Sequence, residues 1–173
     1  MNAVIISVAI LFFLLFLYLL KQSKQPTGLV GIWMMKIWNQ VYFPMVEWAI
    51  SQLEQQNVKN ILDVGIGNGQ STLYLKQYFP NSKVIGIDIS KTAITQAKKW
   101  NIADLNFELK DVGQTTYSAE SFDLITAFQT HFHWPDLSRA FSELRRILRR
   151  DGLILLACEW SKLTYFQPEL KKE

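Results

Sequence analysis

The longest apolar stretch of the chain lies at its N-terminus. Residues 3–20 read AVIISVAILFFLLFLYLL, and Lys21 and Lys24 follow directly. Eighteen helical residues span about 27 Å, close to the roughly 30 Å hydrocarbon core of a bilayer. A cleaved signal peptide would begin with basic residues and end at a small-residue cleavage site, and a buried core helix would show a polar face. The pattern therefore predicts a single transmembrane anchor over residues 1–21, with the remainder cytoplasmic because lysines follow the span.

A short polar segment and an aromatic-rich segment come next. Residues 22–28 include Pro26 and Gly28 and are predicted to be a linker. Residues 29–56 are rich in Trp, Met, Ile and Phe, and Pro44 is expected to divide them into two helices. The aromatic side chains either pack on the following domain or contact lipid beside the anchor, since Trp and Tyr favour the membrane interface. These aromatic positions are Trp33, Trp38, Tyr42, Phe43 and Trp48.

Strand and helix patterns alternate over the rest of the chain, residues 57–173. Ser90 is a suitable N-cap for one of the helices, and Asp151-Gly152 is expected to form a turn. The alternation predicts a doubly wound α/β domain with a mostly parallel sheet. The expected strands are residues 61–64, 83–88, 105–109, 122–128 and 153–159, and the expected helices are residues 71–79, 91–100 and 136–149.

Charge and cysteine content exclude some classes of partner. The formal net charge of +3 is too small to indicate a nucleic-acid partner. Four arginines, at 145, 146, 149 and 150, stand at the end of a predicted helix, where cations suit the helix dipole. The single cysteine, Cys158, cannot form an internal disulfide and lies in an apolar run, which predicts a reduced core thiol.

Three glycines follow the first predicted strand of the domain. Residues 61–69 read ILDVGIGNG, a strand that runs into a turn where glycine lets the backbone approach a ligand. The third glycine of a dinucleotide fingerprint would fall at position 70, which is Gln70. Asp63, just before the turn, suits a ligand that carries an ammonium group. Asp88 ends the second strand, where a carboxylate can accept hydrogen bonds from ribose hydroxyls. This feature suits a dinucleotide and a ribose-containing ligand with an ammonium group equally, so it does not distinguish them.

These motifs together resemble the class I S-adenosylmethionine-dependent methyltransferases. Residues 63–69 resemble the first motif of that family, and residues 84–90 resemble its second strand with the ribose-binding acid. Asp111 matches the acid that contacts the adenine amino group. Residues 121–125 resemble the fourth strand, and residues 133–136 the loop before the next helix. The resemblance covers residues 58–160 and is strongest to small-molecule methyltransferases that act on quinone precursors and other lipophilic acceptors.

The resemblance implies a Rossmann-like methyltransferase fold, S-adenosylmethionine as cofactor, and methyl transfer by in-line displacement to a small, lipophilic acceptor. Such a reaction needs positioning and electrostatics from the protein and no nucleophilic side chain. The family pattern places the cofactor against Asp63, Gly65, Ile66, Gly67, Gly69, Asp88, Ile89, Asp111, Val112 and Gln129.

Two histidines are candidate catalytic bases. His131 and His133 follow the fourth predicted strand, and histidine exchanges protons near neutral pH. Alternatively, they shape the pocket or cap the helix that begins near Asp136. A metal site is not predicted, because no cysteine or further histidine accompanies this pair. Glu159, at the end of the fifth strand, is a further candidate base.

The sequence departs from the family pattern near its end. Arg150-Asp151-Gly152 stands where the family has Pro-Gly-Gly, and the chain stops fourteen residues after the fifth strand. We therefore expect the last two of seven strands to be absent and the fifth strand to be an exposed edge. Two other functions stay open. One is a nicotinamide-dependent oxidoreductase, opposed by Gln70 and Asp63. The other is a non-catalytic, membrane-tethered binding protein, suggested by the short C-terminus.

Overall fold

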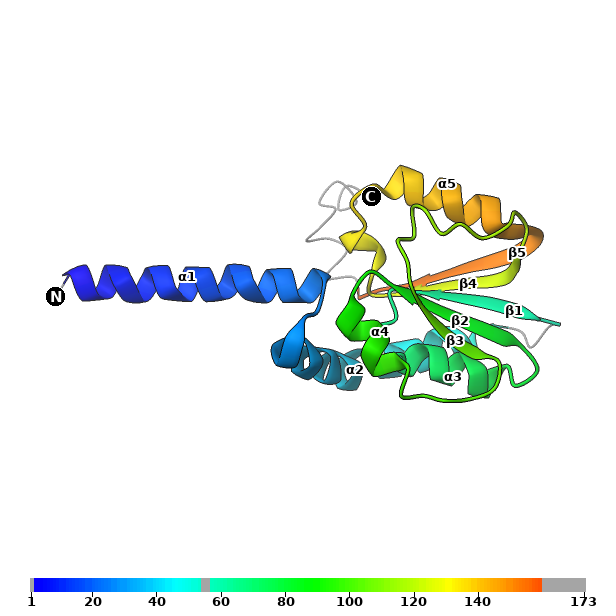
Figure 1. The fold of residues 1–173 in the computed structure, drawn as a ribbon, viewed down its shortest axis with the longest axis horizontal. Coiled ribbons are helices and arrows are strands. Elements are labelled where there is room, and N and C mark those ends of the chain that lie inside the picture. The colour runs from blue at the N-terminus through cyan, green and yellow to red at the C-terminus, as the bar shows by residue number, and fades with distance from the viewer. Residues whose placement is uncertain (1, 54–56, 160–173) are drawn as a thin grey trace.

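A long N-terminal helix is joined to an α/β domain in the computed structural model, which describes residues 2–53 and 57–159 (Figure 1). The strands and helices alternate along the domain as the hydrophobic pattern predicts. In chain order the elements are α1 (Asn2–Lys24), α2 (Gly28–Ser51), β1 (Asn60–Val64), α3 (Gln70–Tyr78), β2 (Lys83–Asp88), α4 (Lys91–Ala97), β3 (Leu105–Leu109), β4 (Phe122–Phe128), the 3-10 turn η1 (His131–His133), α5 (Leu137–Ile147) and β5 (Leu148–Ala157).

The five described strands form one parallel sheet in the order β3-β2-β1-β4-β5. This order places the carboxyl ends of β1, β2 and β4 next to one another, because all strands run the same way. Ligands of doubly wound sheets bind at that edge, where the strand order reverses. The predicted parallel α/β fold is therefore confirmed, and within the described residues β5 is an edge strand.

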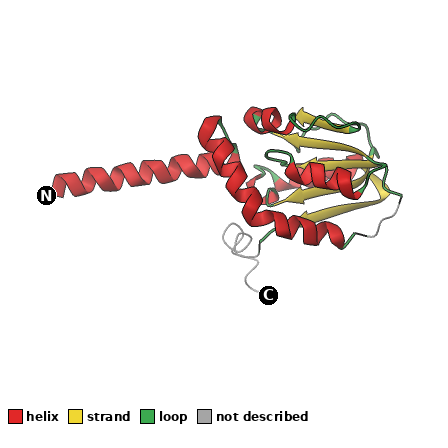
Figure 2. Ribbon diagram, turned by 90° about the horizontal axis from the view of Figure 1, so that it is seen from below, coloured by secondary structure: helices red, strands yellow, loops and turns green. Residues whose placement is uncertain are grey.

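Helices cover both faces of the sheet (Figures 1 and 2). Helices α2, α3 and α4 cover one face, where residues such as Ile50, Leu75 and Ala97 are buried against Ile61 and Val84. Helix α5 covers the other face, and there Ala140, Leu144 and Ile147 pack against Leu62 and Ile125. Two helix caps support this arrangement: Ser90 Oγ accepts a hydrogen bond from Ala93 N, and Asp136 Oδ1 accepts one from Arg139 N.

The predicted turn at Asp151-Gly152 is wrong, because these residues lie inside β5. Leu148 already pairs with Phe122 and Leu153 pairs with Leu124, so the residues between them form a bulge. An ion pair between Arg149 and Asp123 holds the bulge against β4. Arg149 Nε also donates to Glu120 O at 3.2 Å, and Arg146 pairs with Glu143. These two arginines are thus paired within the domain.

Helix α2 is continuous through Pro44, which corrects the predicted division into two helices. Its buried side chains, among them Met35, Val46 and Ile50, lie on both sides of the proline, so burial favours one helix across it. Proline removes one N–H and leaves the carbonyl of Gln40 without its helical partner. Pro44 and Gln40 are both exposed, where water can hydrogen-bond that carbonyl.

Helix α1 extends away from the domain, and its apolar side chains are exposed around its circumference (Figure 1). Of the helices in the described residues, it alone has the length and composition needed to cross a membrane, from Ala3 to Lys24. The helix continues to Lys24, so three residues separate it from α2. This connection is shorter than the predicted linker, and it keeps the end of α1 against the domain.

Candidate functional site

The glycine turn between β1 and α3 has a backbone shape that requires glycine. Gly65, Gly67 and Gly69 have φ angles of 73°, 54° and 82°, in the left-handed region. Gly65 N donates to Ile87 O at 2.8 Å, which fixes the turn to the end of β2. A Cβ at Gly65 would lie 2.1 Å from Thr130 Oγ1, whereas one at Gly67 would meet nothing closer than Met35 Sδ at 3.7 Å. The chain therefore leaves open space in front of Gly67.

Asp88 lies beside this turn at the carboxyl end of β2. Its Oδ2 accepts a hydrogen bond from Gly67 N at 3.0 Å, and its Oδ1 accepts one from Ser90 N at 2.7 Å. Burial raises the pKa of this carboxyl, and the backbone N–H donors from Ser90, Gly67 and Ile89 oppose that rise. Its orientation is fixed by these bonds, as a site that accepts hydrogen bonds from a ligand requires.

Asp63 lies beneath the turn and has no solvent-exposed surface. Its Oδ2 accepts hydrogen bonds from Ser71 Oγ at 2.7 Å and Thr72 Oγ1 at 2.8 Å, and its Oδ1 accepts one from Thr126 Oγ1 at 2.8 Å. Burial outweighs these three donors and raises the pKa of Asp63 to about 6. Direct contact between Asp63 and a ligand ammonium group stays a prediction; the hydroxyl of Ser71 lies between this carboxyl and the cavity described below.

The loop after β4 forms the opposite wall. Gln129 has a φ of 54°, and its side-chain Nε2 and Oε1 are both buried without a hydrogen-bond partner among the described residues. A buried amide without partners is costly, so it marks a position where a ligand or water can supply them. His133 faces the same space, whereas His131 is buried among Phe132 and Trp134 and burial lowers its pKa.

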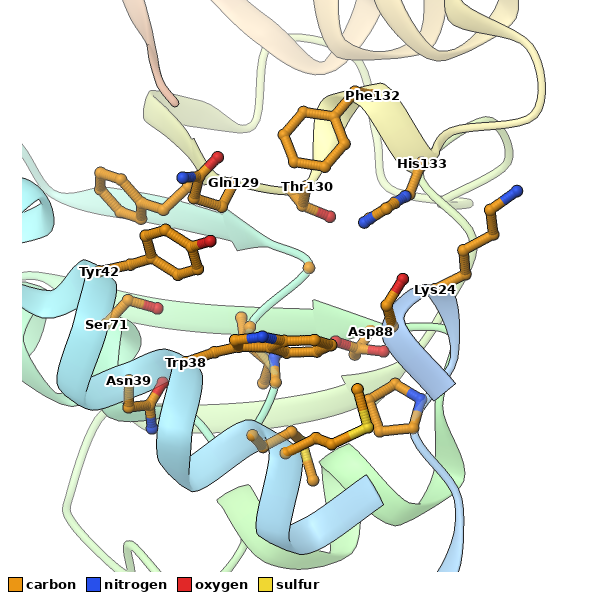
Figure 3. A pocket seen from close by; sticks show the side chains of 18 of the residues that line it. Lys24, Trp38, Asn39, Tyr42, Ser71, Asp88, Gln129, Thr130, Phe132 and His133 are labelled. Carbon is orange, nitrogen blue, oxygen red and sulfur yellow. The ribbon is translucent and has the colours of Figure 1, made fainter. Parts of the chain in front are cut away.

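The two N-terminal helices complete the enclosure (Figure 3). Trp38, Tyr42 and Phe43 of α2 face the glycine turn across a cavity of about 650 Å³. The last turns of α1 also line it, through Phe16, Leu19 and Leu20. Figure 3 shows Lys24 near His133, and the ring of Trp38 extending from α2 into the cavity. A cavity of this size accommodates a cofactor together with part of an acceptor.

The predicted site residues divide into two groups. Those that line the cavity are Gly65, Ile66, Gly67, Asp88, Gln129 and His133. Those that lie outside it are Asp63, Gly69, Ile89, Asp111, Val112 and His131, together with the exposed Glu159. Asp111 is exposed after β3, where its Oδ1 accepts a hydrogen bond from Gly113 N at 2.7 Å. Gly69 serves packing and the start of α3, since a Cβ there would lie 2.8 Å from Ala97 Cβ.

Several residues that build the site were not predicted from the sequence. The hydroxyls around Asp63 had a detectable signal, because Ser71 and Thr72 open the helix after the glycines and a buried carboxylate needs donors. Thr126 could be placed only once the register of β1 and β4 was known, in which Asp63 pairs with Thr126. The contribution of α1 had no local signal, because an apolar helix gives no indication of which residues face the domain.

The residues present fit S-adenosylmethionine. The open space in front of Gly67 admits a ligand, the fixed carboxylate of Asp88 suits ribose hydroxyls, and the unpartnered amide of Gln129 can hydrogen-bond a polar edge. A parallel sheet with a glycine turn after β1 and an acid at the end of β2 defines the class of Rossmann-like, nucleoside-cofactor-binding proteins.

Comparison with known proteins identifies the family within this class. Residues 62–156 match the family model described as a methyltransferase domain, which is more than half of the chain. The chain belongs to the S-adenosylmethionine-dependent methyltransferases, and S-adenosylmethionine is its cofactor. The comparisons do not favour an oxidoreductase or a binding-only protein.

Two of the similar proteins are named for different acceptors. The chain is 36% identical over 89 residues to the release factor glutamine methyltransferase of Flavobacterium psychrophilum. The aligned segment covers 48% of this chain and 31% of that enzyme. The crystal structure of YcgJ from Bacillus subtilis is 26% identical with a TM-score of 0.60, over 73% of this chain and 57% of that one. Geranyl diphosphate C-methyltransferase from Streptomyces coelicolor, solved with S-adenosyl-L-homocysteine, has a TM-score of 0.62 at 19% identity, over 69% of this chain and 46% of that one.

The match covers part of each relative. The chain spans between 31% and 43% of the length of the similar curated proteins. Family membership thus establishes the fold and the cofactor, and the acceptor has to be argued from the cavity of this chain.

Proposed function

We propose that this protein transfers the methyl group of S-adenosylmethionine to a small lipophilic acceptor that enters from the membrane side. The observation that carries the proposal is the composition of the cavity wall. The same cavity is lined by the cofactor turn at Gly65 and Gly67 and by Phe16, Leu19 and Leu20 of the helix that has the properties of a membrane span. The cofactor turn and the apolar side chains of this helix therefore border one cavity, which supports entry of the acceptor from lipid.

The proposal includes a location. A helix with apolar side chains exposed on every side is unstable in water and stable in lipid. Lys21 and Lys24 follow its apolar part, and such lysines favour the cytoplasmic side. We infer a single-pass membrane protein whose methyltransferase domain, residues 57–173, is cytoplasmic. Helix α2 then forms the part that faces both lipid and cavity.

The positions of the cavity residues support an assignment of cofactor contacts. Asp88 would accept hydrogen bonds from the ribose hydroxyls, and the backbone at Gly65, Ile66 and Gly67 would hold the amino-acid part of the cofactor. The amide of Gln129 supplies polar partners across the cavity. Ile89, Asp111 and Val112 lie outside the cavity and would contact the adenine ring from the loops after β2 and β3. Asp63 stabilises the turn through Ser71 and Thr72.

When bound, the cofactor supplies an electrophilic methyl group on a sulfonium. The chain supplies orientation, because the aromatic wall formed by Trp38, Tyr42 and Phe43 restricts the acceptor to the space opposite the glycine turn. The same wall excludes water from that space. His133 faces the cavity and is positioned to accept a proton from a hydroxyl acceptor, whereas the buried His131 supports the loop.

The test uses the full chain in lipid nanodiscs with methyl-labelled S-adenosylmethionine and a lipid extract from host membranes. We expect labelled product in the organic phase. Leu20→Trp, which fills the cavity, should reduce labelling severalfold while S-adenosyl-L-homocysteine still binds. Leu17→Trp is the matched control, because Leu17 lies on the same helix, is exposed and does not line the cavity. Label confined to water-soluble metabolites or protein, or equal effects of the two tryptophans, would refute the lipophilic acceptor.

A further inference from the structure

The connection between α1 and α2 is a closed elbow with its own hydrogen bonds. Gln22 is 2% exposed, although it belongs to a helix that is otherwise almost entirely exposed. Its Oε1 accepts a hydrogen bond from Thr27 N at 2.7 Å, and its Nε2 donates to Thr27 Oγ1 at 2.7 Å. Gly31 of α2 packs directly on the elbow, since a Cβ there would lie 2.8 Å from the carbonyl carbon of Pro26. The two helices are therefore held at a fixed angle.

The elbow rests on the loop that follows β2. Gln25 Nε2 donates to Ile89 O at 3.1 Å, and the buried hydroxyl of Ser90 donates to Pro26 O. These two contacts join residues 64 positions apart in the sequence. They are made by the three-residue connection itself, and so they depend on where α1 ends.

The same loop orients Asp88, the carboxylate that is proposed to accept hydrogen bonds from the ribose of the cofactor. Ser90 N donates to Asp88 Oδ1 at 2.7 Å, and Asp88 Oδ2 accepts from Gly67 N at 3.0 Å. A continuous path of contacts thus runs from Gln22 through the elbow, Ser90 and Asp88 to the glycine turn. A loop held in this way loses less conformational freedom when a ligand binds, which favours affinity.

We propose that the elbow between α1 and α2 is a positioning element of the cofactor site, and that Gln22 and Gln25 set the affinity for S-adenosylmethionine without touching it. The inference rests on the cofactor site of the proposed function and is independent of which acceptor is used. It gives the membrane helix a second role besides location. Because coupling between two sites is reciprocal, bound cofactor also stabilises the docked position of α1.

The test measures binding of S-adenosyl-L-homocysteine to the detergent-solubilised full chain by calorimetry. Gln25→Met keeps the size of the side chain and removes the donor to Ile89 O, and we expect about three- to tenfold weaker binding, the range for one lost hydrogen bond. Gln25→Lys keeps a donor and should bind like the parent. Gln22→Met removes both bonds to Thr27 and should weaken binding at least as much. Gln40→Met is the matched control, an exposed α2 position outside the elbow.

The outcomes separate this inference from the proposed function. If the parent chain does not bind S-adenosyl-L-homocysteine, the proposed function itself fails. If the parent binds but Gln25→Met and Gln22→Met bind equally well, the elbow has no role in the site and the inference is wrong. The inference is also wrong if Gln25→Lys fails to restore affinity, or if Gln40→Met weakens binding as much, because the effect would then be a general loss of stability.

Discussion

Gly65 and Gly67 of the turn have different physical roles, although the sequence presents them as parts of one motif. Gly65 is required by the fold, because Thr130 occupies the space that a Cβ would need. Gly67 borders the cavity and has no close neighbour, so its lack of a side chain serves the ligand. This distinction depends on the loop after β4, which lies far away in the sequence.

Alanine substitutions should separate these two tasks. Gly65→Ala should lower the unfolding temperature strongly, because its Cβ would overlap Thr130 Oγ1 at 2.1 Å. Gly67→Ala should lower the unfolding temperature only by the strain of alanine at positive φ, as much as Gly28→Ala does, but weaken S-adenosyl-L-homocysteine binding roughly tenfold or more. Gly28→Ala controls for backbone strain, because its φ is 58° and nothing lies within 4 Å of its Cβ. Thermal unfolding and calorimetry check both; unchanged binding by Gly67→Ala would contradict the prediction.

The buried carboxyl of Asp63 should affect stability through pH. Its folded-state pKa is about 6, whereas an unfolded aspartate titrates near pH ~3.9. The folded state therefore holds this proton more tightly, so the contribution of Asp63 to stability is fully present below pH ~4 and is lost as the pH rises through 6. The loss is on the order of 3 kcal/mol.

The variant Asp63→Asn should lack this dependence, because its amide does not titrate. The unfolding temperature of the parent should fall relative to that of Asp63→Asn between pH ~4 and 6 and then run parallel. Other carboxyls, such as Glu143 with its pKa lowered to about 2 by Arg146, are common to both proteins and cancel in the difference. A constant difference across this range would show that Asp63 is already charged in the folded protein at low pH.

At the scale of elements, α2 has to satisfy two partners at once. Its later turns bury Val46, Ala49 and Ile50 against the sheet, while its middle turns place Trp38 and Tyr42 in the cavity wall. Trp33 and Trp48 point outward and are 63% and 64% exposed. Packing on the domain therefore holds for one set of aromatic residues, whereas contact of the exposed tryptophans with lipid stays a prediction.

Pro44 weakens this helix where its backbone is solvent-exposed. Replacement by alanine restores an N–H that can bond the carbonyl of Gln40 and removes the unfavourable helix propensity of proline. We expect Pro44→Ala to stabilise the protein by about 1–3 kcal/mol, seen as a higher unfolding temperature by circular dichroism in detergent. Pro80→Ala, outside the helices, serves as the control and should change little. A lower unfolding temperature for Pro44→Ala would mean that the proline stabilises a bend that the packing needs.

At the scale of the whole molecule, the apolar helix α1 and the domain are in direct contact. The end of α1 supplies a wall of the cavity and, through the elbow, a support for the loop beside Asp88. A helix that only provided location would not need these contacts.

Membrane topology can be tested with the native cysteine. Cys158 is the single cysteine of the chain and is partly exposed at the end of β5. We expect the protein to stay in membranes after carbonate washing. A membrane-impermeant maleimide should label Cys158 in inside-out vesicles and not in right-side-out vesicles, because the domain is proposed to be cytoplasmic. The labelling is done at pH ~8.5, because burial raises the pKa of this thiol and the thiolate is the reactive form. Cys158→Ser should abolish labelling. Release by carbonate, or labelling from the outside, would contradict the proposed location.

The sequence by itself determined the α/β alternation, the parallel sheet, the glycine turn and the acid at the end of β2. These features are local: a strand is a short apolar run, and a turn that requires left-handed backbone requires glycine at fixed positions. The positions of Gly65, Gly67 and Asp88 could therefore be predicted together with their neighbourhood, since parallel strands bring their carboxyl ends to the same edge.

The tertiary structure alone decided how the site is enclosed. The burial of Asp63 under three hydroxyls depends on the register between β1 and β4, and the continuity of α2 through Pro44 depends on the face it buries. The cavity wall from α1 and the contact of Gln25 with Ile89 join residues far apart in the chain. No local pattern specifies such contacts, because an apolar helix presents similar side chains on every side and the packing of the domain selects the one that is used.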